Sequence, residues 1–217
     1  TLNDTVNYEW KDGTTTAVTF PFNIAKKAIT VKADAKSMVY GTATEPALTY
    51  TAEGKIDGEA LVGELTREPG TDYGTYAILQ GTVTNANNPN YDITYVDAEF
   101  KITKANQAAI AITGAPATIT YGDEFTLSAT GGSSTGGITW AITEGAQFAT
   151  VDSATGKVTV TGVGTVKVTA TKAGDDNYEP VTADYTFTSV KATPVVSGVA
   201  VSGKVYDTTA PSAVVLT

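Results

Sequence analysis

The sequence contains no cysteine and no histidine among its 217 residues. Without cysteine no disulfide can form, so each small domain in the chain must be held together by apolar burial alone. Without histidine the chain lacks the commonest general base, and both Ser-His-Asp and Cys-His catalytic arrangements are excluded. We therefore expect a protein that is not an enzyme and that needs no cofactor.

Positive charge is also scarce, because 14 basic residues stand against 23 acidic ones and the formal net charge is -9. An acidic surface repels the phosphates of nucleic acids and the headgroups of anionic lipids. The sequence also has no apolar run long enough to span a bilayer. We expect neither a nucleic-acid partner nor membrane insertion by this segment.

An alternation of apolar with polar or small residues is the main structural signal. Ile138, Trp140 and Ile142 follow this period of two, and it recurs over residues 158–160 and 166–170. A period of two places one set of side chains on a buried face and the other set in water. Short polar or glycine-rich segments that can reverse the chain lie between these runs. The pattern predicts an all-β protein built from antiparallel β-sandwiches.

Trp140 is the candidate centre of the core in this part of the chain. Its phase with Ile138 and Ile142 points it inward, where we expect it to pack against Leu127 and Val168. The alternative is an exposed tryptophan that stacks on a sugar ring. The inward phase favours the core.

Landmark dipeptides recur about 80 residues apart, in the same cyclic order, and indicate tandem repeats. Lys-Ala is found at 27–28, 104–105 and 191–192, and Asn-Tyr is found at 7–8, 90–91 and 177–178. The phase predicts two complete repeats over 27–104 and 105–191, preceded over 1–26 by the C-terminal part of another repeat and followed over 192–217 by the start of a further one. We therefore expect a piece of a longer polypeptide, whose two incomplete ends expose strand edges able to pair with other strands.

Within the first complete repeat, the sequence predicts strands separated by Gly- and Pro-containing turns. They cover residues 29–33, 47–51, 61–67, 74–79, 91–96 and 98–104. No Gly/Ser/Pro-rich spacer follows the last of them, so we expect the repeats to be arranged end to end. In the second repeat, the glycine-rich run 131–137 is expected to be a flexible connection between strands.

Several stretches resemble bacterial immunoglobulin-like (Ig-like) repeats. Residues 27–104, with AITVKADAKSMVYG near the start and NPNYDITYVDAEFKITK at the end, look like an MBG-type domain. Residues 105–191 resemble the broader bacterial Ig-like domains through ITWAI, ATVDSATGKVTVTGVGTVKVTAT and AGDDNY. VSGKVYDTTAPSAVVL resembles the opening of a YDG-type repeat, although Thr208 stands where that pattern usually has Gly. The resemblance implies tandem Ig-like sandwiches of extracellular proteins, with no catalytic motif to transfer.

One cluster of oxygen-bearing side chains is a candidate metal site. Asp175, Asp176 and Asn177 could supply ligands to a hard cation such as calcium. Their spacing lacks the alternating ligands and the late Glu of a helix-loop calcium site. The alternative is an Asx-rich turn that joins two strands, and the spacing favours the turn.

Two functions fit these observations. The first is a non-catalytic spacer or stalk of a bacterial cell-surface or secreted adhesin-like protein, whose partners are the neighbouring Ig-like repeats of the same chain. The second is an extracellular binding module for a glycan or a host protein, with exposed tyrosines of the first complete repeat as its contact residues. The candidates for that role are Tyr50, Tyr73, Tyr76, Tyr91 and Tyr95. An exposed cluster of two or more rings would favour binding, and scattered or buried rings would favour the stalk.

Overall fold

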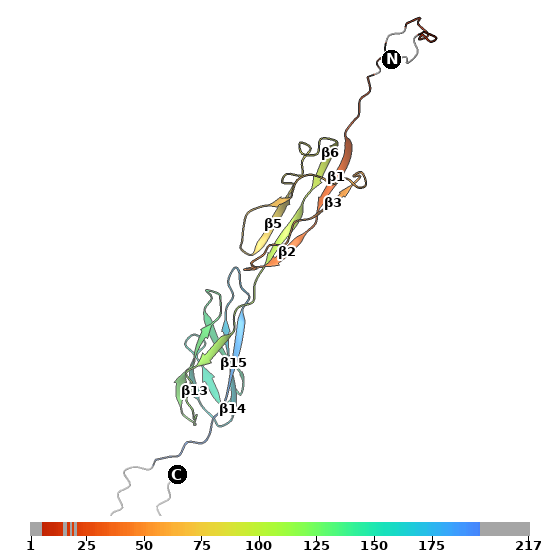
Figure 1. Cartoon of the computed structure of the whole chain (residues 1–217). Helices are drawn as coiled ribbons and strands as arrows, with labels where there is room; N and C mark the ends of the chain where they lie inside the picture. The colour runs from red at the N-terminus through yellow and green to blue at the C-terminus, as the bar shows by residue number, and fades with distance from the viewer. Residues whose placement is uncertain (1–5, 15–16, 18, 20, 196–217) are drawn as a thin grey trace, which may run out of the picture. The chain divides into compact units, whose positions relative to one another are not determined.

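The computed structural model describes residues 6–14, 17, 19 and 21–195 (Figure 1), and all of its regular elements are β-strands. The chain divides into two compact units. The first unit contains residues up to Asn106 together with the short segment Asp175–Glu179, and the second contains Gln107–Gly174 and the residues from Pro180 onward. The all-β fold class predicted from the alternation is confirmed.

The first unit is formed by two sheets. Its strands are β1 (Lys27–Ala33), β2 (Lys36–Val39), β3 (Tyr50–Glu53), β4 (Thr66–Arg67), β5 (Gly74–Leu79), β6 (Tyr91–Val96) and β7 (Ala98–Thr103). One sheet has the order β3-β1-β6 and the other has the order β2-β7-β5-β4. Inward-facing apolar side chains of both sheets form one core, which includes Val31, Ile78, Phe100 and Ile102. This is the two-layer packing expected of a β-sandwich.

Two strand pairs in this unit are parallel, whereas the sequence predicts antiparallel pairing. β1 pairs with β6 in parallel, with Lys27 opposite Tyr91, and β2 pairs with β7 in parallel, with Lys36 opposite Phe100. The parallel pairs arise because the chain changes sheets at Asp34, between β1 and β2. The first two strands of the repeat therefore pair with its last two strands, one pair in each sheet.

The strand predicted at 61–67 is largely absent, since only Thr66 and Arg67 pair as β4. The backbone before them is held by side chains instead of a strand, because Val62 N donates to Asn88 Oδ1 at 2.8 Å. Gly63 has φ +116, and a Cβ there would lie 2.3 Å from Thr82 O. A glycine in this conformation marks a bend of the chain. The strand predicted at 47–51 is also displaced and runs from Tyr50 to Glu53.

The described residues of the second unit form eight strands. They are β8 (Ile110–Thr113), β9 (Glu124–Thr126), β10 (Ser128–Gly131), β11 (Ile138–Glu144), β12 (Ala149–Val151), β13 (Lys157–Val160), β14 (Thr165–Lys172) and β15 (Val181–Thr188). They pair as β11-β14-β15, β12-β13-β9 and β10-β8, and all these pairs are antiparallel. Trp140, Leu127 and Val168 lie in the core between the strands, and Trp140 is only 5% exposed.

The glycine-rich run 131–137, expected to be flexible, is fixed by a buried side chain. Gln107 Oε1 accepts hydrogen bonds from the backbone N–H groups of Ser133 (3.2 Å) and Ser134 (3.1 Å), and its Nε2 donates to Ala173 O (3.1 Å). Ser134 Oγ also donates to Ala173 O at 2.6 Å. The loop is therefore an ordered part of the second unit, because buried polar groups on both sides of it are paired.

The ends predicted to be incomplete repeats fall partly outside the described residues. These cover 192–195 of the predicted YDG-type start and none of the residues that carry that resemblance. Residues 21–26, which belong to the predicted C-terminal part of a preceding repeat, form no strand, and Phe22 and Ile24 are 85% and 82% exposed.

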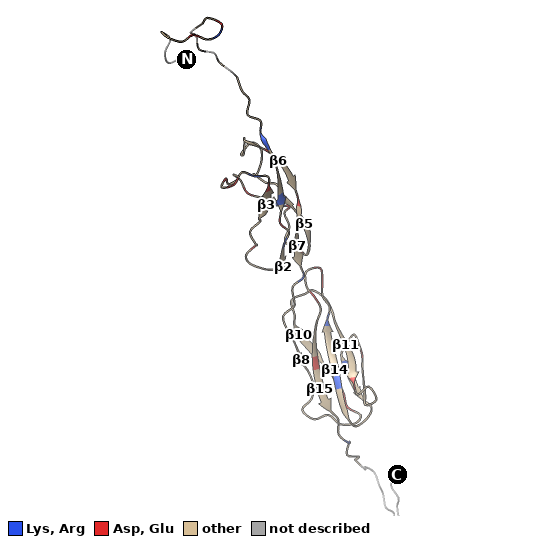
Figure 2. Cartoon of the chain, turned by 90° about the vertical axis from the view of Figure 1, so that its right-hand side faces the viewer, with Lys and Arg blue, Asp and Glu red and all other residues tan. Residues whose placement is uncertain are grey.

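Charged residues are scattered over both units. Figure 2 shows blue and red positions separated by tan stretches along the strands. The ion pairs are local, such as Lys157 with Glu124 at 2.8 Å, and most of them are exposed. Exposed pairs of this kind contribute little to stability. The sheets are therefore held mainly by their apolar cores.

Candidate functional site

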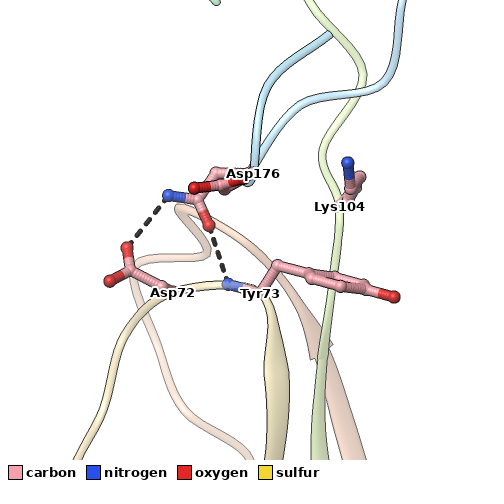
Figure 3. Close-up of a pocket in the computed structure, with 5 residues that line it drawn as sticks. Asp72, Tyr73, Lys104 and Asp176 are labelled. Atoms are coloured by element: carbon pink, nitrogen blue, oxygen red, sulfur yellow. Dashed lines mark hydrogen bonds between the residues drawn. The ribbon is translucent and has the colours of Figure 1, made fainter.

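The candidate site is an open polar pocket of about 350 Å³ in the first unit. It is lined by Asp72, Tyr73, Lys104, Asp176 and Asn177. Figure 3 shows Asp72 and Tyr73 on the turn that leads into β5, and Lys104 on the chain that continues from β7. Asp176 and Asn177 come from the segment Asp175–Glu179, which lies between β14 and β15 in the sequence.

Asn177 is the residue that links the two walls of this pocket. Its Oδ1 accepts a hydrogen bond from the backbone N–H of Tyr73 at 2.7 Å, and its Nδ2 donates to Asp72 Oδ1 at 2.9 Å, as the dashed lines in Figure 3 mark. A primary amide can do both at once, because it carries an acceptor and two donors. Asn177 thus binds the carboxylate of one residue and the backbone N–H of the next residue in the chain.

Backbone pairing and aromatic contacts hold the same segment in the first unit. Ala105 N donates to Asn177 O, and Glu179 N donates to Ala105 O, both at 2.9 Å. The rings of Tyr40 and Tyr178 meet edge to face with their centroids 5.4 Å apart. This is one of the preferred geometries of aromatic pairs.

Lys104 is engaged on two sides. Its Nζ donates to the carbonyl of Asp175 at 2.6 Å and lies 5.4 Å from the centre of the Tyr73 ring. That distance is within the range of a cation–π contact. The ammonium group therefore connects the segment that contains Asp175 to the ring of Tyr73.

The predicted calcium candidates form a turn of the Asx type. Asp175 Oδ1 accepts from the backbone N–H groups of Asn177 (2.9 Å) and Tyr178 (3.0 Å). The amide of Asn177 faces Asp72 and Tyr73, as described above. The described residues contain no group of three His, Cys, Asp or Glu side chains placed to hold a metal ion. Asp175, Asp176 and Asn177 thus lie in a turn that is closed by the Asp175 carboxylate.

The five candidate tyrosines do not form an exposed cluster. Tyr91 is 4% exposed, and Tyr50, Tyr76 and Tyr95 pack against the core of the first unit. Only Tyr73, at 50% exposed, presents a large part of its ring to solvent. The distribution is the scattered and buried one that favours the stalk.

Three of these phenols are also committed to hydrogen bonds inside the first unit, and that of Tyr76 donates to Asp72 O at 2.8 Å. The Tyr91 hydroxyl donates to Glu59, and this hydrogen bond, together with burial, raises the pKa of Tyr91. The Tyr95 hydroxyl donates to Ile78 O at 2.7 Å, and burial raises the pKa of Tyr95. Both groups therefore stay neutral at physiological pH.

Sequence reasoning missed the role of Asp72 and Lys104. Both are single polar residues outside any motif, and they gain a partner only because a segment about 70 residues or more further along the chain returns to them. The recurrent Asn-Tyr dipeptide was the available signal, since it marks the place in each repeat where Asn177 stands.

In the part of the chain that is described, no helix is long and apolar enough to cross a membrane. The buried side-chain nitrogen and oxygen atoms of that part all have hydrogen-bond partners. Catalytic and binding sites without a bound ligand often contain buried polar atoms that lack a hydrogen-bond partner. The described residues contain no such atom.

The strand order and two-layer cores define Ig-like β-sandwich repeats. The family model described as MBG domain (YGX type) matches residues 29–101, which lie within the first unit. This match confirms the MBG-type resemblance of the first complete repeat. No match was found among curated protein sequences.

Solved structures of similar chains include intimin and cadherin fragments. A mutant intimin of EHEC O157:H7 is 28% identical with a TM-score of 0.30, over 38% of this chain and 46% of that one. A C-terminal 282-residue intimin fragment, solved in complex with the intimin-binding domain of the translocated intimin receptor, is 22% identical with a TM-score of 0.28, over 72% and 62%. Drosophila N-cadherin EC1–3 is 10% identical with a TM-score of 0.29, over 78% and 70%. The chain thus spans less than two thirds of both intimin chains.

Proposed function

We propose that the chain is a non-catalytic spacer segment in the stalk of an adhesin-like protein that is secreted by a bacterium or displayed on its surface. The observation that carries this proposal is that three polar side chains lining the candidate pocket are bound to other groups of the same unit. Asn177, Asp72 and Lys104 all have such partners within 2.9 Å. Side chains paired in this way stabilise the fold.

The MBG-type match and the Ig-like sandwiches support the proposal, because small β-domains in series suit a stalk. The absence of cysteine and histidine supports it as well, since it removes the commonest general base and the thiol nucleophile. The proposed location is extracellular, and the proposed partners are neighbouring Ig-like repeats.

A display experiment tests the spacer role. An epitope tag placed before the segment on a cell-surface anchor should become more accessible to antibody-coated beads as one and then two copies of the segment are inserted. A Gly/Ser linker of equal length is the matched control, because a flexible coil gains reach only with the square root of its length. Equal bead capture with the linker and with the segment would contradict the spacer role.

A second candidate function, binding of a glycan or a host protein, is favoured by one observation. Tyr73 exposes half of its ring beside Lys104 at the rim of the open pocket. An exposed aromatic ring offers a stacking surface for a sugar. A glycan array probed with the natural chain and with Tyr73→Ala tests this function. If the chain binds a glycan through Tyr73, the natural chain should give a signal that is lost in the variant.

A further inference from the structure

The same backbone hydrogen bond opens both repeats and shows which residues are equivalent. Lys27 N donates to Asn90 O, and Ala105 N donates to Asn177 O, both at 2.9 Å. In each case the next residue of the loop is the parallel partner, Tyr91 for Lys27 and Tyr178 for Ala105. Asn90 therefore occupies in the first repeat the position that Asn177 occupies in the second.

Asn90 differs from Asn177 in one respect. Asn177 binds Asp72 and the N–H of Tyr73, as Figure 3 shows. The side chain of Asn90 is exposed, and it makes no hydrogen bond to another residue in the described part of the chain. An amide with two donors and an acceptor is thus presented to solvent.

The loop that presents Asn90 is rigid. Asn88 is 6% exposed; its Oδ1 accepts from Val62 N at 2.8 Å and its Nδ2 donates to the carbonyls of Val62 (2.9 Å) and Thr84 (3.0 Å). The backbone N–H of Tyr91 donates to Asn88 O at 3.0 Å. Because the backbone on both sides of Asn90 is held by hydrogen bonds, less backbone entropy is lost when its amide binds a partner.

A small pocket lies beside this loop. It has a volume of about 160 Å³, and its lining includes Glu59, Val62, Asn87, Asn90 and Tyr91. The surface combines the free amide with a shallow recess, as the loop around Asn177 combines an amide with the larger recess in Figure 3.

We propose that Asn90 and the recess beside it are the docking site for the turn of a preceding Ig-like repeat that offers a carboxylate followed by a free backbone N–H. Asp72 and Tyr73 are the example of such a turn within this chain. The amide oxygen of Asn90 accepts from the N–H, and its nitrogen donates to the carboxylate. The proposal rests on the stalk function, because it requires another Ig-like repeat as the partner.

A chimeric chain tests this docking. Residues 1–104 are followed directly by residues 27–217, so that Lys27 of the second copy replaces Ala105 and its Asn90 faces Asp72 of the first copy. Cysteines replace Asp72 in the first copy and Asn90 in the second, and a short bismaleimide joins them, because side chains that meet at their tips are too far apart at Cα for a disulfide. The natural chain has no cysteine, so the reaction is confined to these two positions.

The expected result is efficient crosslinking, equal to that of Asp72→Cys with Asn177→Cys in the natural chain. The matched control is Asn87→Cys in the second copy, because Asn87 is exposed on the same loop but its amide donates to Thr82 O within its own loop (2.8 Å). Crosslinking at least tenfold slower is expected for this control. Equal rates at positions 87 and 90, or no reaction at 90 in a protease-resistant chimera, would overturn the proposal.

A second variant keeps the test decisive if the chimera does not fold. Asp175→Asn with Asp176→Pro gives the natural chain the loop sequence Asn-Pro-Asn-Tyr of the first repeat. Crosslinking between Asp72→Cys and Asn177→Cys should persist in this variant, and its loss in a folded variant would show that a loop of this sequence does not bring the position of its asparagine to such a turn. Bead capture in the display experiment does not depend on Asn90, so failure of the docking site and failure of the stalk function are distinguishable.

Discussion

Arg67 and Glu45 form a bidentate ion pair in the first unit. Arg67 Nε donates to Glu45 Oε1 at 2.6 Å, and one terminal nitrogen donates to Oε2 at 2.9 Å. The guanidinium also lies 4.7 Å from the centre of the Phe100 ring and donates to the carbonyls of Glu68 (2.8 Å) and Gly70 (3.0 Å). One side chain thus connects two loops to the core.

Arg67→Ala should destabilise the first unit, because it removes four hydrogen bonds and leaves two carbonyls without their charged donor. Charge-assisted hydrogen bonds contribute about 1.5 to 3 kcal/mol each when partly buried, and we expect a total loss of about 2 to 3 kcal/mol, since Glu45 remains solvated. Differential scanning calorimetry checks the effect. Lys101→Ala, an exposed residue on β7, is the control and should leave the transition unchanged.

The same pair predicts a pH dependence. The hydrogen bond from Arg67 lowers the pKa of Glu45 below its ordinary value of 4.5. A carboxyl whose pKa is lower in the folded state stabilises the fold above its unfolded pKa, and this contribution is lost as the pH falls through the folded pKa. Urea unfolding should therefore show a midpoint that falls between about pH 5 and pH 3, less steeply in Glu45→Gln. An identical slope in both proteins would contradict this assignment.

Gly156→Ala should destabilise the second unit by about 2 to 4 kcal/mol. Gly156 has φ +72, and a Cβ there would lie 2.6 Å from Leu127 O and 2.9 Å from the ring of Trp140. Both the backbone conformation and the contact with a rigid core side chain oppose the substitution. Gly137→Ala is the matched control, because nothing lies within 4 Å of its Cβ. Thermal unfolding monitored by the fluorescence of Trp140, in a chain that also carries Trp10→Phe, distinguishes the two variants.

Gln107→Leu should loosen the glycine-rich run 131–137 without unfolding the sheets. The substitution leaves the N–H groups of Ser133 and Ser134 without their acceptor, and each buried unsatisfied group costs about 1 to 3 kcal/mol. Amide hydrogen exchange should rise at least tenfold at these two residues and remain slow in β14. Unchanged protection at Ser134, the amide that is buried, would show that Gln107 does not order the loop.

Asn177→Asp should lower the stability of the first unit at neutral pH, and acidification should restore that stability. The new carboxylate would stand where the amide now donates to Asp72 Oδ1, and two like charges at that distance repel each other. Protonation of one of the pair at low pH removes the repulsion, so the melting temperature relative to the natural chain should recover below about pH 4. Asn177→Ala, which lacks the charge, should show a constant deficit across the same range.

The sequence predicts the strands whose apolar residues alternate strictly. β5, β6 and β7 begin and end within a residue of the predicted ranges, because Ile78, Phe100 and Ile102 all point into one core. Alternation also places Trp140 inward. These features are local, since a period of two is enough to specify them.

The remaining features depend on contacts between distant residues. The change of sheets at Asp34 leaves no mark on the hydrophobic pattern, since both halves of the strand face the same core. The strand predicted at 61–67 was wrong over most of its length because Asn88 competes for its backbone. The candidate pocket requires Asn177 to meet Asp72 more than 100 residues away, and no short motif encodes that meeting.

The parallel pairs of the first unit determine how it responds to tension. β2 and β7 run in the same direction, and their chains leave the repeat toward opposite termini. A pull on the two termini therefore slides these strands past one another, and the hydrogen bonds from Lys36 to Val39 along β7 bear the load together. Hydrogen bonds between two strands that are loaded in shear must all break together. In a hairpin that is pulled from its open end, the hydrogen bonds break one after another. We therefore expect the first repeat to resist traction along the chain.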